Sequence, residues 1–210
     1  MSLVLGQIES QIPYDCFGEN EVQNIFKGSI HSRYSLLKRA VATKELIHLR
    51  RGLYLLSEKN RRHSLNLFVI AQKIQGPSYI SFESALSQHG WIPEAVFGIT
   101  SASLKRSKTF KTPVGIFSYQ KVVANPFLVQ IDLVSTEEGN YYLASPWRAL
   151  ADYVYVYKKD WKNLNPLIHS LRIEEESFAG SKKEDLEELL QIYSHYGVQR
   201  FLKGVMKELK

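Results

Sequence analysis

The basic residues between Lys27 and Arg62 are the part of the sequence whose side chains most clearly predict a chemistry. Ten of the chain's 27 basic residues lie in this segment, opposed only by Glu45 and Glu58, so it carries a net charge of +8 in a chain whose total is +6. A concentrated cationic surface binds a polyanion by releasing condensed counterions, and nucleic acid is the commonest such partner. We therefore expect this segment to bind nucleic acid. Its basic residues are Lys27, Arg33, Lys38, Arg39, Lys44, Arg50, Arg51, Lys59, Arg61 and Arg62.

The residue types that usually carry catalysis or hold metals form no recognisable pattern. The six histidines make no HxH or HExxH spacing and no pairing with the single cysteine, which argues against a zinc site. The sequence contains no GxGxxG, Walker or GxSxG motif. We expect no enzymatic activity, no metal and no cofactor, and the sequence indicates no small-molecule substrate.

One group of carboxylates keeps a catalytic alternative open. The four acids precede His169 and could in principle form a cluster with it, although nothing in their spacing requires one; they are Asp132, Glu137, Glu138 and Asp152. Asp152 stands inside an otherwise apolar helical pattern. Because buried polar groups in proteins are hydrogen-bonded, we expect Asp152 to be a buried, hydrogen-bonded residue rather than a catalytic one.

The elements that must position the cations begin with two helices. Apolar residues spaced by three and four predict a helix over 19–26, Gly28 predicts its stop, and Ser29 predicts the cap of the next helix. In that second helix the predicted buried face is Ile30, Tyr34, Leu37 and Val41, which recur at steps of four, three and four. The predicted exposed face is His31, Ser32, Ser35, Lys38 and Arg39, with Arg33 near the edge of the buried face.

A hairpin follows the second helix. Two short strands over 46–50 and 53–56 are joined through Arg51 and Gly52, where glycine supplies the positive φ of a tight turn. Arg50 and Arg51 would stand at its tip, where arginine contacts phosphates or enters a minor groove. The order of elements predicts a winged helix-turn-helix over 1–62. The alternative is an exposed amphipathic helix and hairpin whose charges are merely solvated.

The remainder, 63–210, is predicted to be a mixed α+β domain with a small, mostly antiparallel sheet and several helices. The strands are expected over 97–103, 117–123, 128–134 and 141–144. Helices are expected over 64–75, 81–88, 145–157, 165–172, 183–195 and 198–209, with Ser81 and Ser145 as caps.

A second basic group lies in this predicted domain. It consists of Lys105, Arg106, Lys108, Lys111 and Lys121, and no acidic residue occurs between positions 100 and 121. The group is either a secondary DNA-binding site or a set of lysines that keep a sheet edge from pairing with another sheet.

Four segments together resemble the AbiEi-type abortive-infection antitoxins. They read HLRRGLYLL, GPSYISFESALSQHGWIPE, TPVGIFSYQKV and LASPWRALADYVY, and the similarity runs from about Ile25 to Tyr157. The resemblance implies a bacterial transcriptional regulator with an N-terminal winged helix and a C-terminal antitoxin domain. It implies that the protein represses its own operon by binding inverted repeats, and that it counteracts a toxin resembling a nucleotidyltransferase.

Carried over by position, the resemblance places DNA contacts on the second helix and the hairpin, at Ser32, Arg33, Ser35, Lys38, Arg39, Arg50 and Arg51, to which the helical pattern adds His31. It also implies that the second basic group can present a positive surface to DNA. The alternative function is a nucleic-acid-processing or RNA-binding protein that uses the winged helix only as a docking module.

Cysteine content and hydropathy address the cellular setting. A single cysteine, Cys16, excludes an internal disulfide framework and fits a reducing cytoplasm. Uncharged runs stop at ten residues, far short of the roughly 18 residues of a membrane span. The first residues lack the features of a signal peptide. We expect a cytoplasmic protein without a membrane partner.

Overall fold

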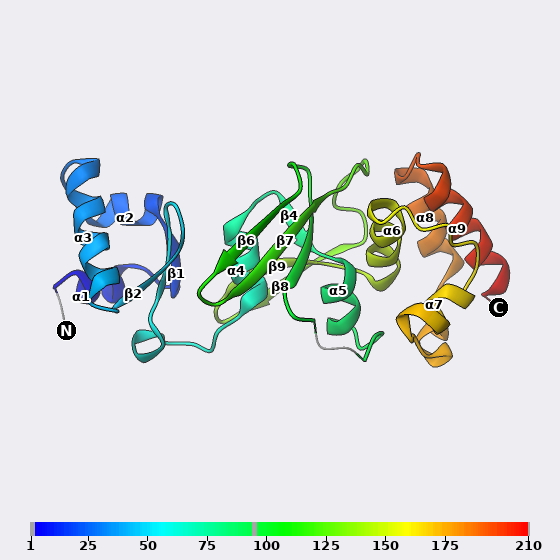
Figure 1. Ribbon diagram of the computed structural model, residues 1–210, viewed down its shortest axis with the longest axis horizontal. Helices are drawn as coiled ribbons and strands as arrows, with labels where there is room; N and C mark the ends of the chain where they lie inside the picture. Colours follow the sequence, from blue (N-terminus) through cyan, green and yellow to red (C-terminus); the bar gives the residue numbers. More distant parts are fainter. Residues whose placement is uncertain (1–2, 94–95, 210) are drawn as a thin grey trace.

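The N-terminal helices, a central sheet and the C-terminal helices follow one another along an elongated molecule, shown by the computed structural model in Figure 1. The model describes residues 3–93 and 96–209. Helices and strands both contribute to it, so the predicted α+β class is confirmed. No helix in the described ranges is both long and apolar enough to cross a membrane.

The N-terminal unit, residues 3–56, combines three helices with a three-stranded antiparallel sheet. The helices are α1 (Leu3–Gln11), α2 (Glu19–Ile25) and α3 (Ile30–Ala42), and the strands are β1 (Cys16–Gly18), β2 (Leu46–Arg50) and β3 (Leu53–Leu56). The strand order is β1-β3-β2. The two predicted helices and the predicted hairpin are thus present at their expected positions, whereas the sequence patterns do not predict strand β1.

Local signals in the sequence set the turn between α2 and α3. The side chain of Ser29 accepts a hydrogen bond from the Ser32 amide at 3.2 Å and caps α3. Gly28 precedes it with a φ of +123°, a backbone conformation that side chains strongly disfavour. At the start of α2 the direction is reversed, because the backbone amide of Gly18 donates to the Glu21 carboxylate at 3.0 Å.

The predicted buried face of α3 is partly wrong. Ile30 and Tyr34 are 62% and 61% exposed, and the buried positions are Arg33, Leu37 and Ala40. The helix is therefore rotated so that the 33–37–40 stripe meets the core. The reason lies in Arg33, whose apolar stem is buried while its Nη1 donates to the Gly28 carbonyl at 2.6 Å.

A six-stranded sheet forms the centre of the molecule, in the order β6-β7-β5-β4-β9-β8. Its strands are β4 (Ser78–Ile80), β5 (Ile99–Ser103), β6 (Lys108–Thr112), β7 (Gly115–Lys121), β8 (Ile131–Thr136) and β9 (Gly139–Ala144). Three of the five strand pairs in this sheet are antiparallel, which confirms the predicted mostly antiparallel sheet, and the other two, β4–β9 and β5–β7, are parallel. The hairpin of β6 and β7 folds back so that β7 lies between β6 and β5, parallel to β5.

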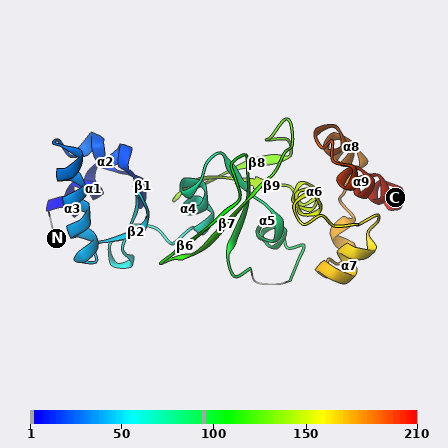
Figure 2. The ribbon, with the colours of Figure 1, turned by 45° about the horizontal axis from the view of Figure 1, so that its top comes forward.

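Helices pack against this sheet, and further helices form the C-terminal end of the molecule. They are α4 (Leu67–Ile74), α5 (Phe82–Gln88), α6 (Pro146–Val156), α7 (Asn165–Leu171), α8 (Lys183–Ile192) and α9 (Tyr196–Glu208). The predicted cap at Ser145 is confirmed, since its side chain accepts from the Arg148 amide. In both ribbon views α6 stands between the sheet and the helices α7–α9 (Figures 1 and 2).

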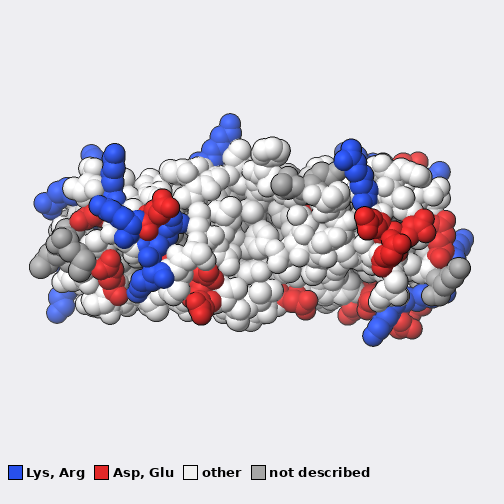
Figure 3. All heavy atoms as spheres, turned by 90° about the horizontal axis from the view of Figure 1, so that it is seen from below, with Lys and Arg blue, Asp and Glu red and all other residues white. Residues whose placement is uncertain are grey.

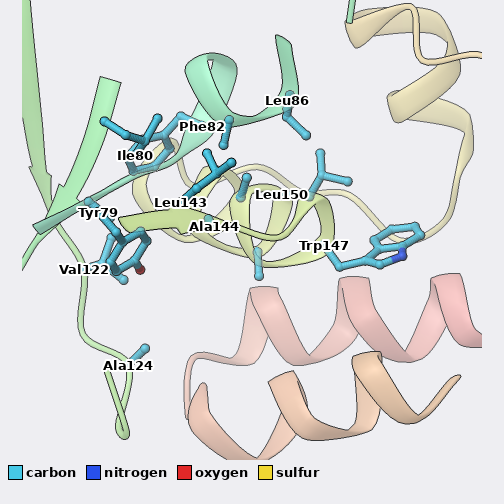
Figure 4. Close-up of a cluster of buried hydrophobic side chains, with 14 of the residues drawn as sticks. Tyr79, Ile80, Phe82, Leu86, Val122, Ala124, Leu143, Ala144, Trp147 and Leu150 are labelled. Carbon is cyan, nitrogen blue, oxygen red and sulfur yellow. The ribbon is translucent and has the colours of Figure 1, made fainter. Parts of the chain in front are cut away.

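Two groups of buried apolar side chains hold these layers together. The smaller one lies inside the N-terminal unit, among α1–α3 and one face of its sheet. The other face of that sheet contributes Cys16, Leu49, Leu53 and Leu55 to the larger group, which fills the rest of the molecule. Part of the larger group surrounds β4, β9 and α6 (Figure 4). One face of the small sheet therefore packs inside the N-terminal unit, and its other face packs against the rest of the molecule. The domain boundary at residue 62 stays a prediction.

Candidate nucleic-acid interface

The outward side of α3 is a continuous stripe of exposed side chains. Successive pairs lie four residues apart, which places them along one side of a helix with 3.6 residues per turn. Apolar and neutral polar side chains occupy the N-terminal half of the stripe, and the cations occupy the C-terminal half. The exposed pairs are Ile30 and His31, Tyr34 and Ser35, and Lys38 and Arg39.

The predicted contact residues of α3 separate into two groups. His31, Ser32, Ser35, Lys38 and Arg39 are exposed, although the Ser35 hydroxyl already donates to the His31 carbonyl at 2.9 Å. Arg33, in contrast, is 9% exposed and hydrogen-bonded to the turn before its own helix. It holds the helix in place and lies outside the exposed stripe.

The hairpin presents the other predicted arginines. Arg50 and Arg51 are exposed beside Gly52, which has a φ of +73° and allows the tight turn. The guanidinium of Arg50 lies 5.8 Å from the centre of the Phe110 ring on β6. No pattern in the sequence indicates this contact, because none predicts strand β6 itself.

The second basic group lies close to this contact, around the edge strand β6. Lys108 and Lys111 are on β6, Lys105 and Arg106 are in the turn before it, and Lys121 ends β7; all five are exposed. The Lys108 ammonium lies 4.7 Å from the centre of the same Phe110 ring. Phe110 therefore contacts one cation of the hairpin and one cation of the second group.

A hollow of about 390 Å³ opens between α3 and the hairpin. Tyr34 lines one side of it, and His48 and Tyr54, whose ring centres are 5.3 Å apart, line the other. An acid, Glu19, and a base, Arg51, line it as well. The hollow thus joins the exposed stripe of α3 to the tip of the hairpin.

Two cations of the basic segment, Arg33 and Arg62, donate to acceptors of the protein itself, although the resemblance places Arg33 among the DNA contacts. Arg62 donates from Nε to the Asp15 carboxylate at 3.1 Å and from Nη2 to the Ile12 carbonyl at 2.8 Å. Arg61 is half-buried. Asp15 also accepts from the backbone amides of Arg62 and the residue after it. The carboxylate ties the N-terminal unit to the segment that leads into α4.

The carboxylates considered for catalysis do not come together. Asp152 is fully buried, as predicted, and accepts hydrogen bonds from the hydroxyls of Tyr79, Ser81 and Tyr193. Ser81 uses its hydroxyl here and not as the predicted helix cap. Asp132, Glu137 and His169 are exposed on other elements.

The partner of Asp152 is an equally buried cation. The Arg148 Nε lies 3.4 Å from the Asp152 carboxylate, and its other nitrogens donate to the Tyr79 hydroxyl and to the carbonyls of Phe127 and Val129. Burial, followed by the charge of Asp152, raises the pKa of Tyr79 and Tyr193 well above 10. Both phenols stay protonated as donors, so the group is a satisfied core network.

Charge is distributed unevenly over the surface. On the face seen in Figure 3, charged side chains gather at the two ends with few between them, basic and acidic ones together at the N-terminal end and a larger acidic group at the C-terminal end. Within residues 3–93 and 96–209, no three His, Cys, Asp or Glu side chains are grouped as a metal ion would need.

The chain matches no model of a known protein family, and its sequence gives no match among curated proteins.

Proposed function

We propose that the N-terminal unit is a winged helix-turn-helix that binds double-stranded DNA, with α3 as the recognition helix and the β2–β3 hairpin as the wing. The observation that carries the proposal is the exposed stripe of α3, which ends in Lys38 and Arg39 beside a hairpin tipped by Arg50 and Arg51. Helix-turn-helix proteins place the outward side of their second helix in the major groove. Cations next to that helix contact phosphates and set its register.

The element order supports this interpretation over a merely solvated basic surface. A hairpin follows α3 directly, and its strands complete a small sheet in the order β1-β3-β2. The tip residues Arg51 and Gly52 line the same hollow as Tyr34, so the tip lies beside the exposed side of α3. A merely solvated basic surface gives no reason for a hairpin tipped by arginine to stand beside an exposed helix. His31, Ser32 and Ser35 supply hydrogen-bonding groups to the same surface, and base-edge contacts need such groups.

We propose that the second basic group extends this surface as a secondary DNA contact. The Phe110 ring lies beside both Arg50 and Lys108, so the hairpin and the edge strand β6 are neighbours. The proposed secondary contacts are Lys105, Arg106, Lys108, Lys111 and Lys121.

We further propose that the protein represses its own operon from inverted repeats and acts in the cytoplasm as the antitoxin to a nucleotidyltransferase-like toxin. This part rests on the resemblance to AbiEi-type antitoxins. Tyr79, Ser81 and Asp152 belong to the most specific of the resembling segments and are all buried. The resemblance therefore supports a shared core, and the toxin-facing surface needs its own test: co-expression of the neighbouring toxin gene should arrest growth, and this protein should restore it.

Operator binding is tested by titrating the protein against its own upstream DNA and against unrelated DNA of the same length in a mobility-shift assay. We expect a saturable complex with the upstream fragment whose affinity falls with salt at a log–log slope of about −0.9 per phosphate contacted. Equal affinity for the unrelated fragment would overturn the operator claim. Binding to RNA of the same sequence in preference to DNA would favour the docking-module alternative.

A further inference from the structure

Ile30 and Tyr34 are large apolar side chains in an unusual place. They are 62% and 61% exposed on the outward stripe of α3, inside the most basic segment of the chain. Exposed apolar groups on a charged surface cost solvation free energy, and such positions mark contact sites when several adjoin one another. The two lie one helical turn apart, so they form one small patch.

The patch is part of a shaped surface. Both residues line the hollow between α3 and the hairpin, which His48 and Tyr54 close on the far side. Glu19 also lines it. Arg51 lines the hollow as well, so an acid and a base are both present there. The cations at the C-terminal end of the stripe lie farther along the helix, where they attract phosphate. The apolar part and the cationic part of the stripe are therefore suited to different parts of one ligand.

The order of side chains along α3 matches the way a recognition helix meets duplex DNA. Ile30 and Tyr34 lie in its N-terminal half, and Lys38 and Arg39 follow toward its C-terminal end. The N-terminal residues of a recognition helix contact base edges, and its flanks contact the backbone. The only apolar group on a major-groove base edge is the C5-methyl of thymine.

We propose that Ile30 and Tyr34 contact thymine methyl groups in the major groove, while Lys38 and Arg39 hold the adjacent phosphates. The proposal rests on the proposed DNA binding and names its specificity: operators of this protein carry thymines opposite the N-terminal half of α3. The ligand of the apolar patch formed by Ile30 and Tyr34 is thus the methyl edge of the duplex.

The test replaces every thymine of the upstream fragment by uracil, which removes the methyl groups and leaves the base pairing and phosphates. We expect the wild-type protein to bind the uracil fragment about tenfold more weakly than the thymine fragment, which corresponds to a few methyl contacts. Tyr34→Ala should bind the thymine fragment more weakly and lose most of this difference. Tyr34→Phe keeps the aromatic ring and should retain the difference in affinity between the two fragments.

Lys38→Ala is the matched control, because it should weaken binding to both fragments by the same factor. The substituted side chains are exposed, and a urea unfolding curve for each variant verifies that it folds. Equal wild-type binding to both fragments, with the upstream DNA still preferred over unrelated DNA, would overturn methyl recognition and leave operator binding intact. If Tyr34→Ala lowered the affinity for both fragments by the same factor, methyl recognition would be overturned as well. That result is expected if Tyr34 instead contacts a second copy of the protein. If the preference for upstream DNA disappeared, both proposals would be contradicted.

Discussion

Cations in α3 and in α6 have the same formal charge and opposite surroundings. Lys38 and Arg39 stand exposed on the outward stripe of α3, whereas Arg148 of α6 is fully buried. Acceptors surround Arg148: the Asp152 carboxylate, the Tyr79 hydroxyl and two backbone carbonyls. A buried guanidinium needs such acceptors, and an exposed one leaves its donors to an outside ligand.

The acceptors near a basic residue therefore decide its role. Arg33 illustrates the point within α3 itself, because its neighbours Lys38 and Arg39 face outward while it bonds to the Gly28 carbonyl. A count of charges in the sequence includes all three equally. Substitutions can separate the two kinds of cation, from the largest expected effect to the smallest.

Removing the carboxylate of the buried network should cost the most stability. Asp152→Ala leaves Arg148 buried without its ion partner, so we expect the free energy of unfolding to fall by about 3–5 kcal/mol. Urea denaturation followed by circular dichroism measures the decrease. The matched control is Asp132→Ala, an exposed carboxylate, which should change stability by less than about 0.5 kcal/mol. Similar results for the two variants would contradict a satisfied core network.

The Asp15 anchor should contribute a smaller, pH-dependent stability. Burial acts to raise the pKa of Asp15, but hydrogen bonds from the His63 and Arg62 backbone lower it below its ordinary value of 3.8. A lowered folded-state pKa stabilises the protein above about pH 4, and the contribution disappears as the pH falls through the folded-state value. Asp15→Asn should therefore cost about 2 kcal/mol at pH 7 and less below pH 4.

Urea unfolding at pH 7 and near pH 3 measures this difference, with Asp132→Asn as an exposed control. A decrease in stability that is the same at both pH values would show that the charge of Asp15 is not what anchors the segment after residue 60.

Replacing the buried arginine of α3 by methionine should lower stability, whereas the same replacement of an exposed arginine should lower DNA affinity. Arg33→Met removes one hydrogen bond and should lower the free energy of unfolding by about 1 kcal/mol, with DNA affinity unchanged within a factor of about two. Arg39→Met should leave stability unchanged and weaken DNA binding severalfold. A larger decrease in affinity from Arg33→Met would mean that its side chain leaves the Gly28 carbonyl to contact DNA.

The second basic group should have the smallest effect. Lys105→Ala with Lys108→Ala should leave stability within about 0.5 kcal/mol and weaken binding less than Lys38→Ala with Arg39→Ala does. Mobility-shift titrations of the two double variants give the ranking. The reverse ranking would move the main DNA contact to the edge strand β6.

Local signals predict much of the fold, and long-range contacts account for what they miss. Ser29, Gly28, Gly52 and Ser145 act within a few residues, so the helix starts and the hairpin could be predicted. The parallel pairs β4–β9 and β5–β7 each join strands that do not follow one another directly in the chain, and no short pattern encodes them.

The candidate site shows the same limit. Exposure of Lys38 and Arg39 followed from periodicity, but the exposure of Ile30 and Tyr34 did not, since apolar residue types predict burial. Only the packed structure shows that Arg33 takes the inward position on α3. The contact between Arg50 and the ring on β6 could not be predicted either, because it joins strands that lie far apart in the sequence.

The salt dependence of operator binding tests the central claim most directly. It compares the wild type with a variant in which Lys38, Arg39, Arg50 and Arg51 are all replaced by alanine. If these side chains bind phosphates, the log–log slope should become shallower by about 0.9 for each phosphate that the variant no longer neutralises, or up to about 3.6 in total. An unchanged slope in a folded variant would contradict the assignment of the α3 stripe and the hairpin tip as the DNA-binding surface.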